Sequence, residues 1–166
     1  MDQAEQKKVG QALTSRVSAG LTFIEFNYLN NHPTPDAAWI RNIYILLSFY
    51  TELLLKGIYV AKKQFENLTD LDNKLKSIGH NFVSAGEVIG EDVLHEFGIK
   101  SIHSEGHEYI VETEDGKFYV QDFNDIRYDF IDGRVRTLNG DEHIMFKKQI
   151  EIMEKINTKL KPLVWN

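Results

Sequence analysis

One stretch of the chain, residues 42–63, combines the longest apolar run of the sequence with a regular spacing of polar residues. Ser48, Glu52 and Lys56 recur in it at intervals of four, which places them on one narrow stripe of a helix with 3.6 residues per turn. The other sides of this helix are apolar, so we expect it to be buried nearly all round. A charged pair is then held against the core of the protein.

Two interpretations of Glu52 and Lys56 are open. Burying an ion pair is roughly neutral or unfavourable for stability unless both partners make further hydrogen bonds, so the pair predicts a ligand-binding site. Alternatively, it is an ordinary pair one turn apart at the edge of the apolar face, with its charged ends reaching water. A buried structural pair would lose stability in Lys56→Met, whereas a binding site would lose its ligand and keep the fold.

Composition narrows the class of protein. The chain has 166 residues, enough for one domain with a proper core and short for two, so we expect one domain over residues 1–166. It has no cysteine, which excludes disulfides and is typical of a cytoplasmic protein. The net charge of −6 argues against duplex DNA as a partner. The apolar run contains Glu52 and is too short for a membrane span, so no membrane partner is expected.

Helical periodicity recurs along most of the chain. The central helix begins with Thr34, Pro35 and Asp36, which supply an N-cap, a proline at the first helical position and an acid in the first turn. In the first helix, Phe23, Phe26 and Tyr28 are expected to widen the apolar face toward its end. The expected helical segments are residues 3–30, 34–65, 67–79, 82–97 and 141–160.

Caps, glycines and a proline mark the ends of these helices. Thr69 opens a capping pattern for the third helix, and Gly79 closes it. Gly86 and Gly90 weaken the helical pattern of residues 82–97. Pro162 follows the last helix and is expected to lie beyond its end.

The period changes between residues 99 and 123. Tyr109, Val111 and Thr113 alternate with polar residues, residues 114–116 form a turn, and the alternation resumes after it. This pattern predicts a β-hairpin inserted near residues 107–122 of a helical protein. Three histidines nearby lack the fixed spacing and supporting shell that metal ligands need, so neither a metal site nor a cofactor is expected.

His80 is a candidate for ligand binding with Glu52 and Lys56. Because Gly79 is expected to end its helix in a left-handed conformation, backbone geometry sets the position of His80. It either caps the junction by bonding to backbone or to the Glu52 carboxylate, or faces a cleft with Lys56 or Arg127 and contacts phosphate.

Two arginines and a second histidine complete the candidates. Arg127 lies among four acids in residues 122–130, where it forms local salt bridges or points toward a bound phosphate. Arg136 and His143 are a candidate catalytic pair for metal-free RNA cleavage, in which the histidine moves a proton and the arginine stabilises charge on phosphorus. Two such residues at this spacing also arise by chance.

Three short motifs carry a resemblance to a known family. They are TELLLKG (Thr51–Gly57), LKSIGHNF (Leu75–Phe82) and IRYDF (Ile126–Phe130). Their order resembles the HEPN superfamily, small helical-bundle domains of prokaryotic defence and toxin systems and of some eukaryotic proteins. The resemblance covers roughly residues 10–160. It implies a mainly α fold, an up-and-down bundle of four to five helices with the hairpin as an insertion.

The resemblance also implies function and partners. It predicts a nucleotide- or RNA-associated module of bacterial defence or toxin–antitoxin type, commonly a homodimer, with an antitoxin or a nucleotidyltransferase-type protein as a partner. Active HEPN nucleases are similar to one another in an arginine, a polar residue and a histidine on one helix; here Thr137 stands at the polar position and Asn139–Gly140 interrupts the helix. Nuclease activity is therefore left open. The competing interpretation is a noncatalytic protein-interaction (dimerisation) domain whose polar residues lock the bundle.

Overall fold

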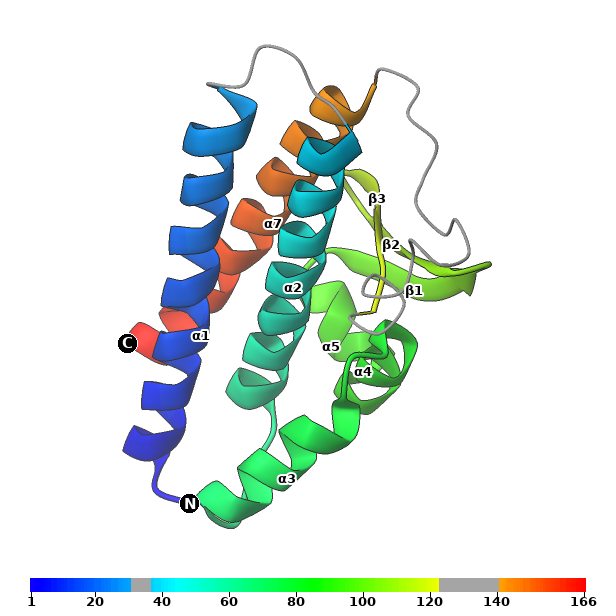
Figure 1. Cartoon of the computed structure of the whole chain (residues 1–166). Helices are drawn as coiled ribbons and strands as arrows, with labels where there is room; N and C mark the ends of the chain where they lie inside the picture. The colour runs from blue at the N-terminus through cyan, green and yellow to red at the C-terminus, as the bar shows by residue number, and fades with distance from the viewer. Residues whose placement is uncertain (31–36, 123–140) are drawn as a thin grey trace.

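The structure, a computed structural model of the chain, describes residues 1–30, 37–122 and 141–166. It is mainly helical, with a small antiparallel sheet on one side (Figure 1), which confirms the predicted class of a helical bundle with a β-hairpin. The helices are α1 (Gln3–Ile24), which continues into the π-helical turn η1 (Glu25–Leu29), α2 (Ala37–Lys62), α3 (Leu68–Ile78), α4 (Phe82–Ile89), α5 (Glu91–Glu96) and α7 (Glu142–Trp165). The strands are β1 (Ile99–Glu105), β2 (Glu108–Thr113) and β3 (Gly116–Val120).

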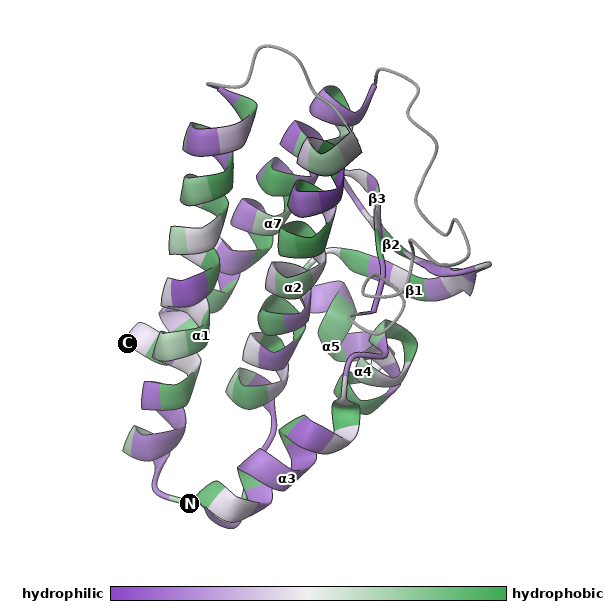
Figure 2. Ribbon diagram, in the orientation of Figure 1, coloured by the Kyte–Doolittle hydropathy of each residue, from purple (hydrophilic) through white to green (hydrophobic). Residues whose placement is uncertain are grey.

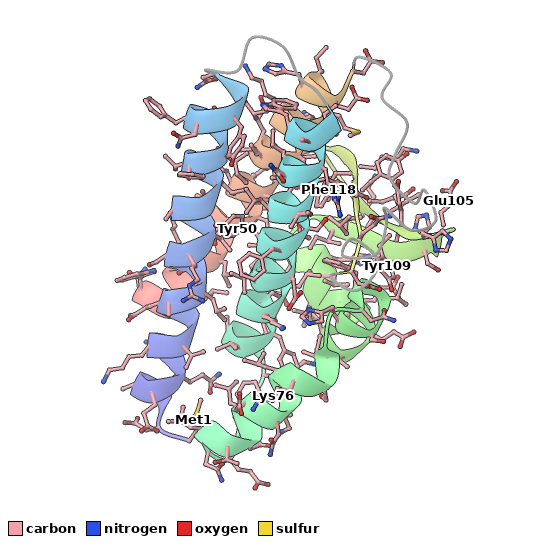
Figure 3. All side chains as sticks on the ribbon, viewed as in Figure 1. Met1, Tyr50, Lys76, Glu105, Tyr109 and Phe118 are labelled. Carbon is pink, nitrogen blue, oxygen red and sulfur yellow. The ribbon has the colours of Figure 1, made fainter. Side chains whose placement is uncertain are left out.

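Helices α1, α2 and α7 pack against one another and form the bundle (Figure 1). Glycines permit close approach: Gly20 of α1 lies against the ring of Tyr50 of α2, and Gly10 of α1 lies against Val164 of α7. Figure 3 shows Tyr50 between α1 and α2. All three helices contribute fully buried side chains to a shared core, which include Val17, Leu21, Ile24, Ile43, Leu47, Ile58, Ile150 and Met153. Each such side chain contributes about 1.5 to 3 kcal/mol when buried.

Helix α2 is the central element, as predicted. It is largely hydrophobic in Figure 2, whereas α3 is more hydrophilic. By length and composition α2 could cross a membrane, but 67% of its most apolar window is buried inside the protein, as in the core helix of a soluble protein. The predicted N-cap Thr34, with Pro35 and Asp36, lies outside the described residues.

Helices α3, α4 and α5 differ from the prediction in two details. The expected cap at Thr69 is wrong: the side chain of Asn67 caps α3 by accepting a hydrogen bond from Asp70 N at 2.9 Å. Both residue types cap helices well, and here the helix begins two residues earlier than Thr69 allows. The expected helix 82–97 is divided at Gly90, whose φ of 98° is open to glycine at little cost.

The sheet contains the predicted hairpin and one further strand. In the hairpin, Val111 of β2 pairs with Phe118 of β3, and Tyr109 pairs with Val120. Strand β1 had not been predicted; it adds to the free edge of β2, where Ile102 pairs with Val111. Because paired residues share a face, Ile102, Val111 and Phe118 form one apolar surface, and the sheet uses it to pack on the helices.

Helix α7 does not end before Pro162 but continues through it to Trp165. Proline costs a helix one backbone hydrogen bond, so neighbouring contacts must hold the last turn in place. Val164 packs on Gly10, its carbonyl accepts a hydrogen bond from Gln11 Nε2 at 2.9 Å, and Trp165 Nε1 donates to Thr14 Oγ1 at 3.2 Å. Tertiary contacts with α1 therefore extend the helix beyond the proline.

Candidate functional site

Three predicted site residues meet where α2 faces the junction between α3 and α4. The Glu52 carboxylate accepts a hydrogen bond from Lys56 Nζ at 2.6 Å through Oε1, and its Oε2 lies 2.7 Å from His80 Nδ1. The Glu52 and Lys56 side chains are 13% and 17% exposed, whereas His80 is 47% exposed. Glu52 therefore bridges a lysine of its own helix and a histidine from the junction. We call these three residues the Glu52 cluster.

The local sequence explains the position of His80. Helix α3 closes at Gly79, which has a positive φ of 60°, and the Asn81 side chain caps α4 by accepting a hydrogen bond from Ser84 N at 3.0 Å. His80 is thus the single residue between two capping residues, so the backbone directs its side chain. The bond to Glu52 is the contact expected of a histidine that stabilises the junction.

Ser48, the first residue of the polar stripe, has a different role. It is buried, and its Oγ accepts a hydrogen bond at 3.2 Å from the backbone N–H of Gln121, just after β3. This bond joins the end of the sheet to the central helix. The stripe therefore divides into a structural serine and the Glu52 cluster.

Little space is left beside the Glu52 cluster. The crevice there has a volume of about 10 Å³ and is lined by Glu52 and His80 together with Ile78, Gly79 and Phe82. A void of that size holds about one water molecule, so neither a nucleobase nor a phosphate fits between Glu52 and His80. The cluster can hold the helix junction together, and it can present the half-exposed imidazole of His80 at the surface.

The predicted catalytic histidine, His143, lies in the first turn of α7. Its Nε2 donates to the carbonyl oxygen of Leu29 at 2.8 Å, and its ring stacks on Trp39 with centroids 6.4 Å apart and an interplanar angle of 8°. Trp39 lies near the start of α2 and precedes Glu52 by 13 positions, about 20 Å along a helix. The structure therefore brings Glu52, Lys56 and His80 together and keeps His143 apart from them.

The two candidate arginines, Arg127 and Arg136, lie outside the described residues. The approach of Arg127 to the Glu52 cluster and the pairing of Arg136 with His143 therefore stay predictions. Within residues 1–30, 37–122 and 141–166, no three histidine, aspartate or glutamate side chains gather in an arrangement that would hold a metal ion.

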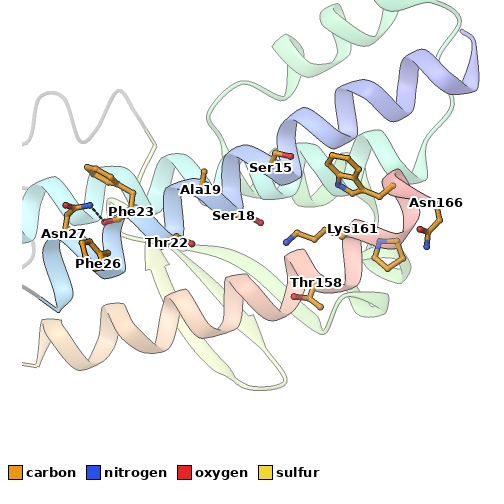
Figure 4. Close-up of a pocket in the computed structure, with 12 residues that line it drawn as sticks. Ser15, Ser18, Ala19, Thr22, Phe23, Phe26, Asn27, Thr158, Lys161 and Asn166 are labelled. Carbon is orange, nitrogen blue, oxygen red and sulfur yellow. Dashed lines mark hydrogen bonds between the residues drawn. The ribbon is translucent and has the colours of Figure 1, made fainter.

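A second feature, which the sequence analysis missed, is a groove between α1 and α7 (Figure 4). Its volume is about 1090 Å³. Phe23 and Phe26 lie toward one end of it, and Lys161 and Asn166 lie toward the other. Small and hydroxyl side chains such as Ser18 form the wall between them. We call this feature the α1–α7 groove.

The α1–α7 groove exposes three large aromatic side chains. Phe23, Phe26 and Trp165 are 52%, 65% and 54% exposed. The expectation that Phe23, Phe26 and Tyr28 widen the apolar face of the first helix is therefore wrong for the two phenylalanines, whereas Tyr28 packs against the core. Leu21 and Ile24 occupy that face, and the two phenylalanines project from other sides of the helix. Trp165 was missed because the helix was expected to end before Pro162.

Charged residues flank the groove. Lys161 lines it, and Glu154 lies two turns earlier on α7. Partial burial, and then the nearby charges of Glu25 and Glu151, raise the pKa of the Glu154 carboxyl above its ordinary value, and the charge of Lys161 offsets part of this effect. Within the part of the chain that the structure describes, neither Glu154 nor Lys161 forms an ion pair.

No protein-family model, curated protein or solved structure matches the chain. The likeness to HEPN domains therefore stays a resemblance of three short sequence motifs.

Proposed function

We propose that this chain is a noncatalytic helical protein-interaction domain, HEPN-like in organisation and cytoplasmic, that forms a homodimer through the α1–α7 groove. The observation that carries the proposal is the exposure of Phe23, Phe26 and Trp165 around one groove of about 1090 Å³. Soluble monomers rarely expose large contiguous apolar patches, and aromatic side chains are enriched at protein interfaces. A second copy of the chain is the partner that best fits the charges beside the groove.

The arrangement of the polar candidates supports a noncatalytic role. The Glu52 carboxylate contacts Lys56 and His80 inside the protein, and the adjoining crevice has a volume of only about 10 Å³. A carboxylate satisfied in this way stabilises a helix junction without needing a ligand. The ring nitrogen of His143 that faces Leu29 is likewise engaged with a backbone carbonyl.

One observation favours a second candidate function, an RNA- or nucleotide-associated module of defence or toxin–antitoxin type. The His80 ring is half exposed and shares a carboxylate with Lys56, so a small movement would present an imidazole and an ammonium group to a phosphate. On this candidate, Arg127 would join the binding group, and Arg136 with His143 would cleave RNA.

The two candidates are separated by measuring the mass in solution and the activity of the same purified chain. Sedimentation velocity over a range of protein concentrations should show a reversible dimer, and Phe26→Ser should shift it toward monomer with an unchanged melting temperature. Ser77→Cys, at an exposed position on α3, serves as the matched surface control and should leave the dimer unchanged.

In parallel, single-stranded RNA should be neither cleaved nor retained by the wild-type chain or by His80→Gln. A wild-type chain that stays monomeric at every concentration would overturn the proposal. So would RNA cleavage that is lost in a folded His143→Ala variant.

A further inference from the structure

We propose that the two copies are related by a two-fold axis beside Thr158, with their α7 helices antiparallel and with Lys161 of each copy paired with Glu154 of the partner subunit. This inference rests on the proposed function, because it specifies how the α1–α7 groove is filled.

The spacing along α7 defines the contact. Glu154, Thr158, Lys161 and Trp165 follow one another at intervals of four, three and four, so they lie on one face of the helix. The last three of them line the groove. In two antiparallel copies related by an axis that passes α7 between the levels of Asn157 and Thr158, a residue after the axis faces the residue equally far before it. Lys161 then faces Glu154 of the partner subunit, and symmetry makes this contact twice.

Contacts between α1 and α7 fix which of their residues lie at the same level. Gly10, near the start of α1, touches Val164, near the end of α7. The carbonyl of Leu29, just after α1, bonds to His143 at the start of α7. The two helices therefore run antiparallel within one copy. Interpolation between these two contacts places Phe23 of α1 at the same level along the helix axes as Ile150 of α7.

The same two-fold axis brings the exposed aromatic residues together. Ile150 lies as far before the axis as Trp165 lies after it, so Trp165 faces the level of Phe23 in the partner subunit. Both side chains line the groove and both are exposed in the single chain. Two aromatic contacts would therefore flank two ion pairs. Buried aromatic anchors are where binding energy usually concentrates.

Charge complementarity is the reason to choose a second copy as the occupant. Glu154 lies beside Glu25 and has no ion-pair partner among the residues described, and the same holds for Lys161. The face is thus mainly negative at the Glu154 end and positive at the Lys161 end, although the charge of Lys161 also acts on Glu154 of its own chain. A two-fold axis matches each end with its opposite, which fixes the orientation of the pair.

The surface that α1 and α7 form together is large enough for a stable dimer. Helix α1 has 22 residues and α7 has 24, so each is more than about 30 Å long, and two adjacent helices are about 20 Å across. This footprint is of the order of the roughly 800 Å² per partner that a standard-size interface buries.

A charge-swap experiment on the full chain tests the pairing. Glu154→Lys alone and Lys161→Glu alone place like charges opposite each other twice, and each should weaken dimerisation by about tenfold or more in sedimentation velocity. The double variant, with both substitutions, restores opposite charges in every pair and should recover most of the wild-type affinity. Glu87→Lys on α4 and Lys100→Glu on β1 make the same changes of net charge at exposed positions away from the groove. Neither control should affect dimerisation.

A cross-link tests the position of the axis. The native chain has no cysteine, so Thr158→Cys introduces a single thiol close to its own symmetry mate. Packed helices whose axes are 8–10 Å apart bring facing Cα atoms to within the distance that a disulfide spans. Under mild oxidation this variant should form a covalent dimer at concentrations where the wild type dimerises. Ser77→Cys on α3 should not.

The outcomes separate the inference from the proposed function. A dimer that forms in the wild type but ignores both charge reversals, or fails to cross-link through Thr158→Cys, overturns this arrangement and leaves the dimerisation proposal standing. A wild-type chain that stays monomeric overturns both. Thermal melts of every variant show that lost association does not result from unfolding.

Discussion

Lys56 Nζ donates a hydrogen bond of 2.6 Å to Oε1 of Glu52 one turn earlier on the buried helix α2. A second pair with the same spacing, Lys74 and Asp70 on α3, has a hydrogen bond of 2.9 Å. The second pair lies at the surface, with the Lys74 side chain 43% exposed. The two ion pairs have the same spacing on their helices but differ in exposure. Comparing the stability that is lost when each lysine is replaced therefore measures how burial changes the contribution of an ion pair.

The first prediction compares these pairs. Lys56→Met keeps most of the stem volume and leaves the Glu52 carboxylate, mostly buried, with His80 as its remaining partner in the cluster. It should lower the free energy of unfolding by about 2 to 4 kcal/mol, because an uncompensated charge is costly inside a protein. Lys74→Met, the matched control, should have a smaller effect, because Asp70 keeps a hydrogen bond from the backbone N–H of Glu66 at 2.9 Å and the ammonium group of Lys74 is more exposed to water. Urea unfolding measures both.

The double variant Glu52→Gln with Lys56→Met sharpens this test. It removes both charges, so it should recover much of the stability that Lys56→Met loses. If Lys56→Met melts like the wild type and instead abolishes RNA binding, the Glu52 cluster is a binding site and the structural interpretation is wrong.

The contact between Glu52 and His80 could be anticipated from sequence because two local rules determine it. Helical spacing aligns Glu52 with Lys56, and Gly79 ends α3 so that His80 is directed by the backbone. The hairpin was predictable for a similar reason, since alternation and a turn signal are both local. The roles of Arg127 and Arg136 stay predictions, because both residues lie outside the part of the chain that the structure describes.

The α1–α7 groove was not predictable in the same way. Helical periodicity identifies an apolar face, but Phe23 and Phe26 lie on other sides of the helix and are more than half exposed. Whether such a side is buried depends on which elements pack there, and the position of Trp165 depends on contacts between Val164 and Gly10 that accompany the continuation of α7 past Pro162. These contacts join residues far apart in the sequence. No local pattern reveals them.

A second prediction concerns the cap of α3. Asn67→Ala removes the acceptor for Asp70 N and should lower the free energy of unfolding by about 1 kcal/mol. Thr69→Ala should change it much less, because Thr69 is exposed and lies inside the first turn of the helix. Equilibrium unfolding of the two variants side by side decides which residue is the cap. Equal losses would contradict the assignment to Asn67.

A third prediction concerns the close approach of α1 and α2. A Cβ atom on Gly20 would lie 2.1 Å from Cζ of Tyr50, so the ring must move in Gly20→Ala. Overpacking costs about 1 to 3 kcal/mol, whereas alanine gains about 1 kcal/mol over glycine in a helix, and we expect a net loss of stability. In Gly86→Ala the nearest atom, Ile102 Cδ1, is at 3.4 Å, so this variant should be neutral or stabilised.

Removing the Tyr50 ring provides the internal test of that clash. In a Tyr50→Leu background, Gly20→Ala should become neutral or stabilising, because the atom it meets is gone. A Gly20→Ala variant as stable as the wild type would show that the ring moves freely, and the close approach would then have little energetic consequence.

The last prediction concerns the pH dependence of the contact between the hairpin turn and α7. Lys155 Nζ donates to Oδ2 of Asp115 at 2.7 Å, and this hydrogen bond is the main reason why the pKa of the Asp115 carboxyl is lowered from its ordinary value of 3.8. The same bond raises the pKa of Lys155 above 10.5. A lowered carboxyl pKa contributes stability that is present above 3.8 and is lost as the pH falls through the folded-state value. A raised lysine pKa contributes stability that is present below 10.5 and is lost as the pH rises through the folded-state value.

The pair should therefore stabilise the hairpin against α7 between these two limits. Lys155→Gln should return the Asp115 pKa toward 3.8, measured by NMR titration of the side-chain carboxyl. The difference in unfolding free energy between the wild type and Lys155→Gln should be largest near neutral pH and should shrink below 3.8. Because Lys155 also lies 3.6 Å from Glu114, Glu114→Gln is the control, and it should leave most of the Asp115 shift in place. A titration of Asp115 that is the same with and without Lys155 would contradict the assignment of its lowered pKa to this hydrogen bond.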